Sequence, residues 1–180
     1  GSGKSNVAFN LSFQLIHHCK DLNKIMYIYP FNTLVEQNMK SMKKIFGDNE
    51  DAMSNISVVN SVTPILKDKE EDYSFKEYEK ALLDRQFFNY PITLSTHVTL
   101  FDLMFGNNKE SSFAFYQLAN SVIVLDEIQS YKNTIWTEII SFLKGFSKIF
   151  NSKIIIMSAT LPNLDFLSDE QNNAIVLIQN

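Results

Sequence analysis

Three features are nearly or wholly missing from this sequence. It has one cysteine, Cys19, so an internal disulfide is excluded and a reducing compartment is favoured. We expect that cysteine to pack inside the first helix. No apolar run reaches the roughly 20 residues of a membrane span, and no signal peptide is visible. These absences favour a cytoplasmic protein, and the Asn-, Ile- and Lys-rich composition with a single arginine indicates an AT-rich bacterial genome.

Acidic side chains outnumber basic ones, with 20 Asp and Glu against 16 Lys and Arg. The formal net charge is −4 at pH 7, which excludes a generic polyanion-binding domain. Arg85 is the single arginine, and its charged helical surroundings favour an ion pair. With three histidines and one cysteine, the sequence shows no metal-ligand cluster. His17 and His18, at the expected end of the first helix, are assigned to the surface or the helix dipole.

The first five residues form a recognisable motif. Gly1-Ser2-Gly3-Lys4-Ser5 matches the second half of the phosphate-binding loop G-x-x-x-x-G-K-[ST]. Its glycines let backbone N–H groups surround phosphates, Lys4 would reach the β- and γ-phosphates, and the Ser5 hydroxyl would bind Mg²⁺. A Gly-Ser remnant of cloning is the alternative, but it does not explain the amphipathic run from Val7 to Ile16. We expect the rest of the loop and its preceding strand upstream of residue 1.

A second motif follows an apolar run. Val122 to Leu125 are four apolar residues, three of them β-branched, which predicts a strand buried on both faces. Asp126 and Glu127 follow where that strand should end, and ligands of open α/β sheets bind beyond the carboxyl ends of strands. Asp126 would help to hold Mg²⁺, and Glu127 would orient or activate a water molecule. A strand that merely ends in charged loop residues is the alternative.

Strands and helices alternate along the chain, which predicts an α/β fold with a doubly wound, mainly parallel sheet and helices on both faces. A cap at Asn32 or Thr33, with Glu36 in the first turn, is expected for the second helix. Residues 47–51 are expected to form a loop, residues 67–72 an exposed charged insertion and residues 106–109 a turn. Helices are expected at about 4–19, 32–46, 75–88, 97–105 and 134–150, and strands at 25–29, 56–59, 92–94, 122–125, 153–157 and 174–178.

Polar clusters follow four of the expected strands. In a parallel sheet all four clusters fall on one edge, beside the phosphate-binding loop. They are Pro30-Phe31-Asn32-Thr33, Ser95-Thr96-His97, Asp126-Glu127 and Ser158-Ala159-Thr160.

These motifs together resemble a known family. Gly1 to Ser5, Asp126 to Gln129 and Ser158 to Thr160 resemble motifs I, II and III of the DEAD-like helicases of superfamily two, and Pro30 to Gln37 resembles motif Ia. Within that superfamily, the chain resembles the CRISPR-associated helicase–nuclease of type I systems. The stretches that carry this closer resemblance are residues 29–37, 94–105 and 120–162.

The resemblance implies a domain and its ligands. The 180 residues correspond to the first RecA-like domain of a P-loop NTPase, which binds ATP and Mg²⁺. We expect the nuclease domain and the second RecA-like domain, which carries the arginine fingers, to lie outside these residues. The implied partners are single-stranded DNA and a CRISPR RNA-guided surveillance complex.

It also implies a role for each matching residue. Gly1, Ser2, Gly3, Lys4 and Ser5 would bind the phosphates, and Ser5 and Asp126 would hold Mg²⁺, with Asp126 acting through water. Glu127 would be the catalytic base, and Gln129, where relatives carry His or Asp, would sense the γ-phosphate. Nucleic-acid contact and coupling to nucleotide state would fall to the remaining motif residues, Pro30, Asn32, Thr33, Thr96, His97, Ser158 and Thr160. For His97 a role as a helix-capping residue is the alternative.

The resulting hypothesis is an ATP-dependent motor that moves along single-stranded DNA and unwinds duplexes in CRISPR interference. An RNA helicase of the same superfamily is one alternative. A nucleotide-switched interaction module without helicase activity is the other. An unrelated P-loop ATPase or kinase would not account for Pro30 to Gln37 or for Ser158-Ala159-Thr160.

Overall fold

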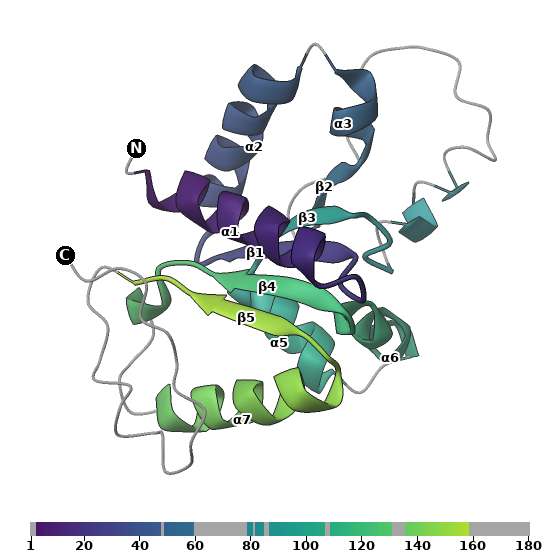
Figure 1. The fold of residues 1–180 in the computed structure, drawn as a ribbon. Helices are drawn as coiled ribbons and strands as arrows, with labels where there is room; N and C mark the ends of the chain where they lie inside the picture. Colours follow the sequence, from purple (N-terminus) through teal and green to yellow (C-terminus); the bar gives the residue numbers. More distant parts are fainter. Residues whose placement is uncertain are drawn as a thin grey trace.

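The computed structural model describes residues 3–47, 49–59, 79–80, 82–84, 87–106, 109–130 and 136–158. Within these ranges five strands form one sheet in the order β2-β3-β1-β4-β5, and every neighbouring pair is parallel. Figure 1 shows this sheet running through the middle of the molecule. The strands are β1 (Lys24–Tyr29), β2 (Ile56–Val59), β3 (Ile92–Thr96), β4 (Ser121–Leu125) and β5 (Lys153–Ile156).

Helices cover both faces of the sheet, as the alternation of elements predicts (Figure 1). One face packs against α1 (Lys4–His18), α2 (Asn32–Phe46) and the short α3 (Glu50–Ser54). The other face packs against α5 (His97–Phe105), α6 (Lys109–Phe115) and α7 (Trp136–Ile149). Two 3₁₀ turns, η1 (Tyr116–Leu118) and η2 (Ile128–Ser130), lie on either side of β4 in the chain. The doubly wound, RecA-like α/β architecture expected from the sequence is therefore confirmed.

The central strands are buried because the helical layers leave neither face of them in water. All five residues of β4 are buried, and in β1 all except Lys24 are buried. Continuous apolar sequence is what such a position requires, since both sides of the strand contact hydrocarbon. The edge strand β5 is less covered, with Lys153 exposed and three isoleucines half-buried.

Several element boundaries differ from the expected ones. Helix α1 ends at His18, and Cys19 is its half-buried C-cap, so the expectation that this cysteine lies inside the helix is wrong. In α2 the N-cap is Phe31 and no side chain caps the helix, so neither Asn32 nor Thr33 has the predicted capping role. Glu36 falls beyond the first turn, which contains no acidic residue.

Two short helices begin where the sequence predicts loops. Helix α3 begins at Glu50, inside the expected loop of residues 47–51, and the Asn49 side chain caps it by accepting from Ala52 N at 3.0 Å. Helix α6 begins at Lys109, at the end of the expected turn. The expected strand at 174–178, the charged insertion at 67–72 and half of the expected helix at 75–88 lie outside the described residues.

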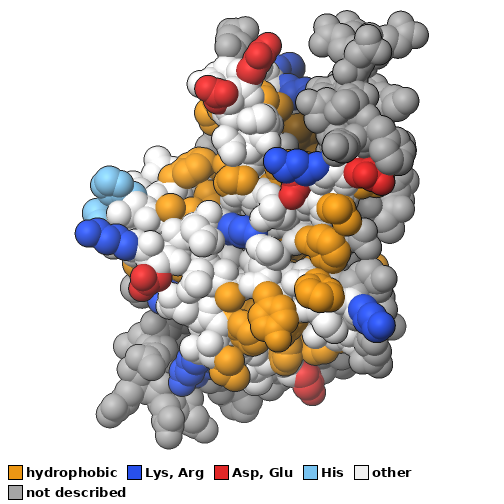
Figure 2. All heavy atoms as spheres, turned by 90° about the vertical axis from the view of Figure 1, so that its right-hand side faces the viewer, with side chains coloured by type: hydrophobic (Ala, Val, Ile, Leu, Met, Phe, Trp, Pro, Cys, Tyr) orange, Lys and Arg blue, Asp and Glu red, His pale blue; other side chains and the backbone are white. Residues whose placement is uncertain are grey.

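The surface carries exposed aromatic side chains on the side where Figure 1 places α6. Figure 2 shows apolar side chains gathered on that side of the molecule. Phe113 of α6 is 66% exposed and Tyr116 of η1 is 72% exposed. No helix in the described part of the chain is both long enough and apolar enough to cross a membrane.

Candidate functional site at the carboxyl edge of the sheet

The four polar clusters lie along one edge of the sheet. The strand register pairs Tyr29 with Thr96, Ile28 with Leu125, and Leu125 with Ile156. Because these strands are parallel and end nearly level, the residues that follow them meet at their carboxyl ends. The edge predicted from the sequence therefore exists, and the described members of all four clusters lie on it.

Helix α1 brings the described part of the phosphate-binding motif to the same edge. Gly3 is the N-cap, with no side-chain cap, and Lys4 and Ser5 are the first two helical residues. Apart from its chain neighbours, no atom of the described residues lies within 4 Å of the position that a Cβ atom on Gly3 would take, so these residues leave the space beside the helix start open. The first turn contains no acidic residue. An open, uncapped helix N-terminus with a lysine suits an anion such as phosphate. Gly1 and Ser2 lie outside the described residues.

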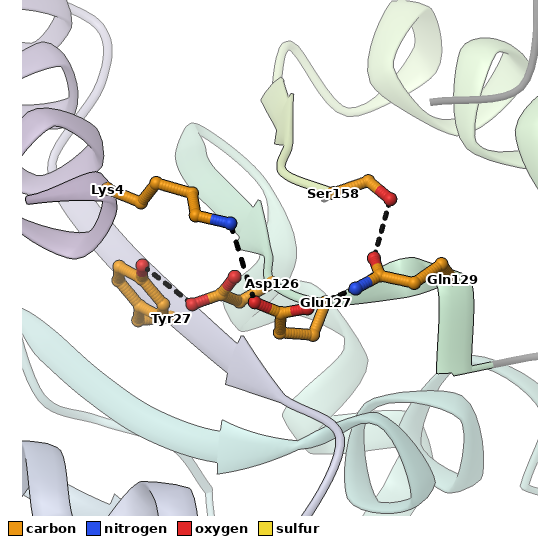
Figure 3. Close-up of polar contacts among 6 residues, drawn as sticks. All are labelled: Lys4, Tyr27, Asp126, Glu127, Gln129 and Ser158. Atoms are coloured by element: carbon orange, nitrogen blue, oxygen red, sulfur yellow. Dashed lines mark hydrogen bonds and ion pairs between the residues drawn. The ribbon is translucent and has the colours of Figure 1, made fainter. Parts of the chain in front are cut away.

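The turn after β4 is fixed by both neighbouring strands. Asp126 N donates to Ile28 O of β1 at 2.9 Å, and Ile128 N donates to the carbonyl of Met157, just after β5, at 3.3 Å. Glu127 between them has a φ of 51°, in the left-handed region that a residue with a side chain rarely adopts. Backbone strain of this kind is concentrated at functional sites. Here it accompanies two neighbouring carboxylates that face different partners (Figure 3).

Glu127 belongs to a connected set of polar side chains drawn from three motifs (Figure 3). Lys4 Nζ lies 3.8 Å from Glu127 Oε1, and Gln129 Nε2 donates to Glu127 Oε2. Ser158 Oγ in turn donates to Gln129 Oε1 at 2.5 Å. Lys4 and Glu127 are each about one-third exposed, so their ion pair is weak and can be exchanged for a ligand. The residues assigned to motifs I, II and III are thus in direct contact.

Asp126 faces a different partner, a tyrosine of β1. Its side chain is 7% exposed, and the Tyr27 hydroxyl donates to Asp126 Oδ2 at 3.1 Å. Burial raises the pKa of Asp126, while the hydrogen bond from Tyr27 and the charge of Lys4 act in the opposite direction. A buried carboxylate that retains its charge needs such partners or a cation, so this side chain is suited to a metal.

His97, at the start of α5, is buried beneath the same edge. It is 1% exposed, and burial lowers its pKa to about 4, although a hydrogen bond involving the Asp126 backbone acts in the opposite direction. The imidazole is therefore neutral near pH 7. Its burial places the ring out of reach of a nucleic-acid backbone in this structure, which disagrees with the predicted contact. Its N-terminal position in α5 agrees with the expected helix start.

The other predicted nucleic-acid residues divide into accessible and buried ones. Thr33 is exposed and Pro30 and Asn32 are partly exposed, and among the described residues Asn32 Oδ1 has no hydrogen-bond partner. Thr96 is 5% exposed, and its hydroxyl caps α5 by accepting from Thr99 N at 3.3 Å. The accessible part of the edge is thus the start of α2. Thr160 lies outside the described residues, as does Arg85.

The helices that begin at this edge leave their N-termini free of acidic residues. The first turns of α1, α2 and α5 contain none, whereas the short α3 has both Glu50 and Asp51 there. Acidic side chains would neutralise the positive ends of the helix dipoles. Their absence leaves three positive helix ends facing the same region, which partly compensates for a chain of net negative charge.

The described residues do not form a self-sufficient metal site. They contain no group of three or more His, Cys, Asp or Glu side chains that could hold an ion. Mg²⁺, however, usually binds through one or two protein oxygens together with substrate phosphates and waters. Ser5 and Asp126 fit that pattern, and so does the open space beside Gly3.

Two residues of the edge were not among the predicted site residues. Tyr27 contacts Asp126, and Phe31 is 61% exposed beside Pro30. Tyr27 could not be found from the sequence because tyrosine in a buried strand is ordinary core composition. Phe31 could have been found from the sequence, since an aromatic residue in a polar cluster after a strand is a candidate for ligand contact.

A groove of about 540 Å³ lies between α1 and α2, beside the edge. Phe9, Phe13, Met42 and Phe46 give it an apolar lining, and of the predicted site residues Ser5 alone reaches it. The groove is therefore formed by the two helices, and the polar contacts described above lie outside it.

Comparison with known proteins places this geometry in a family. The family model for the DEAD/DEAH box helicase matches residues 1–167. Among solved structures, the crystal structure of the DUF1998 helicase MrfA is similar, with a TM-score of 0.56 and 20% identity over 93% of this chain, a likeness that concerns the fold. The chain spans 24% of the length of that protein, and no curated protein matches it. Because the family model covers most of its length, the chain belongs to the DEAD/DEAH box helicase family.

Proposed function

We propose that this chain is the first RecA-like domain of an ATP-hydrolysing helicase that moves along single-stranded DNA. The observation that carries the proposal is the connected set Lys4, Glu127, Gln129 and Ser158. It joins the start of the phosphate-binding helix to the turns after β4 and β5. Such a set can transmit the state of a nucleotide at α1 to the rest of the edge.

ATP would bind with its phosphates at the N-terminus of α1. Backbone N–H groups and Lys4 would contact the phosphate oxygens, and Gly3 has no side chain to obstruct them. Ser5 and Asp126 would hold Mg²⁺, which neutralises charge on the phosphates. Lys4 would then exchange Glu127 for phosphate, a change that costs little because the ion pair is long and partly exposed.

Release from Lys4 would free Glu127 for catalysis. Its carboxylate would accept a proton from the attacking water and orient that water toward the γ-phosphate. Gln129, which bonds both Glu127 and Ser158, would report the presence of the γ-phosphate. We expect the arginine that stabilises the transferred phosphate to come from a second RecA-like domain.

A single strand would lie across the start of α2. Thr33 and Asn32 would contact the sugar–phosphate backbone, and the exposed Phe31 ring would stack on a base. Thr96 would act by fixing the start of α5, because its hydroxyl is engaged in the cap. Ser158 and Thr160 would couple nucleotide state to this surface.

DNA is proposed as the substrate because of residues 29–37, 94–105 and 120–162, which resemble the CRISPR-associated helicase–nuclease. The same resemblance supports an RNA-guided surveillance complex as the partner that delivers the motor to its DNA. If this is right, the complex bound to target DNA will stimulate ATP hydrolysis by the full-length protein more than the same DNA alone. Equal stimulation would count against the CRISPR assignment and leave the motor assignment intact.

The main test is ATP hydrolysis by the full-length protein alone, with single-stranded DNA and with single-stranded RNA. Stimulation by DNA supports the proposal. Stimulation by RNA alone would move the chain to the RNA helicases. Absence of stimulation by either would favour a nucleotide-switched interaction module.

The role of Glu127 has its own test. Glu127→Gln should reduce DNA-stimulated hydrolysis by roughly 100-fold or more, because loss of a general base typically costs that much. ATP binding should persist, since the phosphates contact α1. Glu50→Gln, which changes an exposed glutamate of α3 outside the motifs, is the matched control and should hydrolyse ATP normally. Near-normal hydrolysis in Glu127→Gln would refute the assigned role.

A further inference from the structure

We propose that Tyr27 is a positioning residue for the magnesium site, because its hydroxyl fixes one oxygen of Asp126 and directs the other toward the metal. This inference rests on the proposed function, since it assumes that Asp126 helps to hold Mg²⁺. Nothing in the sequence motifs assigns Tyr27 a role.

The contact depends on the order of the strands. Tyr27 lies on β1 opposite Val124 of β4, and Asp126 follows two residues later. The Tyr27 hydroxyl is 3.1 Å from Asp126 Oδ2 although the two residues are 99 positions apart in the chain. Asp126 is also fixed at its backbone, through its N–H bond to Ile28 O at 2.9 Å. Strand β1 therefore holds both the main chain and the side chain of Asp126.

Aromatic neighbours on both sides hold the Tyr27 ring in place. Its centroid is 4.6 Å from that of Phe9 and 4.5 Å from that of Tyr29, with interplanar angles of 28° and 18°. The side chain is fully buried. Phe9 lies one turn beyond Ser5 on α1, so the ring bridges the phosphate-binding helix and the strand. A ring packed in this way presents its hydroxyl in one orientation.

The Tyr27 hydroxyl donates the hydrogen bond in this contact, since an ionised carboxylate can only accept. Figure 3 shows the hydroxyl directed at Asp126.

The chemical consequence follows from the two oxygens of a carboxylate. With Oδ2 held by Tyr27, Oδ1 remains for the metal or for a water on it. Carboxylates that bind metals are commonly held by such outer hydrogen bonds, and loss of one typically costs about 10- to 100-fold in metal affinity. Tyr27 would thus lower the Mg²⁺ concentration that the nucleotide site needs.

Tyr29 supplies a matched control. It is the next inward-facing residue of β1, it is 1% exposed, and among the described residues its hydroxyl has no hydrogen-bond partner. Tyr29→Phe and Tyr27→Phe each delete one buried hydroxyl from the same stack of rings. They differ in that the hydroxyl of Tyr27 bonds Asp126 and that of Tyr29 does not.

The experiment measures binding of a fluorescent ATP analogue to the full-length protein as Mg²⁺ is increased. Tyr27→Phe should raise the Mg²⁺ concentration for half-maximal binding by about tenfold or more. Binding of the nucleotide in EDTA should be unchanged, because no metal is involved. Tyr29→Phe should show the wild-type Mg²⁺ dependence.

Each other outcome has a distinct meaning. If Tyr27→Phe keeps the wild-type Mg²⁺ dependence, or if both variants shift equally, the inference is wrong while the proposed function stands. If binding of the analogue to the wild-type protein does not depend on Mg²⁺, the proposed magnesium site is wrong, and the inference about Tyr27 is wrong with it. A double variant adds a further check. When Tyr27→Phe is combined with Asp126→Asn, it should change the Mg²⁺ dependence no further than Asp126→Asn alone does. If Tyr27→Phe has the same effect with and without Asp126→Asn, the inference is wrong.

Discussion

The two faces of the sheet are packed with different kinds of side chain. We name the face under α5, α6 and α7 the hydrocarbon face, because phenylalanine, leucine, isoleucine and methionine dominate its core. Two polar side chains, Thr93 and Ser95, are also buried on it. The face under α1 and α2 includes two buried tyrosines, Tyr27 and Tyr29, whose rings stack 4.5 Å apart. A hydrocarbon layer contributes stability alone, whereas phenol hydroxyls can also position other groups.

The hydrocarbon face is dominated by rings from different elements. Phe146 of α7 is 3% exposed and lies 4.5 Å from Phe150, 5.6 Å from Phe115 and 6.2 Å from Phe142, measured between ring centroids. Phe142 in turn contacts Phe105 of α5 at 4.7 Å. These contacts join all three helices of that face and lie apart from the polar contacts at the carboxyl edge.

The tyrosine face lies closer to the chemistry. Tyr27 reaches Asp126, and Phe9 of α1 packs on Tyr27 within two turns of Lys4. The Tyr29 hydroxyl has no partner among the described residues, and leaving a buried hydroxyl unbonded costs about 1–3 kcal/mol. The comparison teaches that the two faces differ in what they place near the site: the face under α1 and α2 puts a phenol hydroxyl against Asp126, whereas rings on the other face join its helices to one another.

The largest expected effect tests the stability of the hydrocarbon face. Phe146→Ala should lower the free energy of opening α7 by about 3–5 kcal/mol, because it removes a buried ring and leaves a cavity. Hydrogen exchange of the full-length protein in increasing urea would measure that free energy. Ile149→Ala, at a residue of the same helix that is 79% exposed, should change it by less than about 0.5 kcal/mol. Equal effects would show that α7 does not anchor this face.

The next effect concerns His97, where the hydrocarbon face meets the site. Its pKa is about 4 in the folded protein and 6.5 ordinarily, so between these values the unfolded chain binds a proton that the folded chain does not. The free energy of unfolding is therefore unaffected by this group above pH 6.5. It falls by about 1.4 kcal/mol per pH unit as the pH is lowered toward 4, and by about 3 kcal/mol in all.

His97→Gln should remove that part of the pH dependence. The measurement is urea-dependent hydrogen exchange in β3 and α5 at several values between pH 7 and pH 4. His17→Gln, at an exposed position of α1, should leave the wild-type dependence in place. The same slope in His97→Gln as in the wild type would show that burial of this ring does not control stability.

The smallest expected effect is on DNA binding, and it is tested by comparing one exposed aromatic residue beside the site with another away from it. Phe31→Ala should weaken binding of single-stranded DNA by about 1–3 kcal/mol, the usual value of one base stacked on a ring. Fluorescence anisotropy of a labelled oligonucleotide would measure it. Phe113→Ala, at an exposed residue of α6, should not change the affinity. An equal loss in both variants would remove Phe31 from the proposed binding surface.

Most strands and long helices could be predicted because local pattern and tertiary packing agree there. The apolar run of Val122 to Leu125 is a fully buried strand, and α5 has the expected bounds, His97 to Phe105. Parallel strands also made the shared edge predictable, since their carboxyl ends must meet. Helices α3 and α6 could not be predicted, because helices of five and seven residues are marginal in water and depend on packing, as at the buried Ala114.

Site residues were predictable where chemistry demands a residue type at a given spacing. Lys4, Glu127, Gln129 and Ser158 could be named from motifs, and the structure brings them into contact. The burial of His97 was not predictable, because a histidine at a helix start can face either water or the core.

By itself, the sequence determined which segments become strands, where the phosphate-binding helix begins and which carboxylates follow a buried strand, because hydrophobic pattern and motif spacing are local properties. The tertiary structure alone decided that β1 lies beside β4. That neighbour relation places the Tyr27 hydroxyl on Asp126 across 99 residues of chain. Strand order is set by how helices cover both faces of the whole sheet, so no local stretch of sequence contains it.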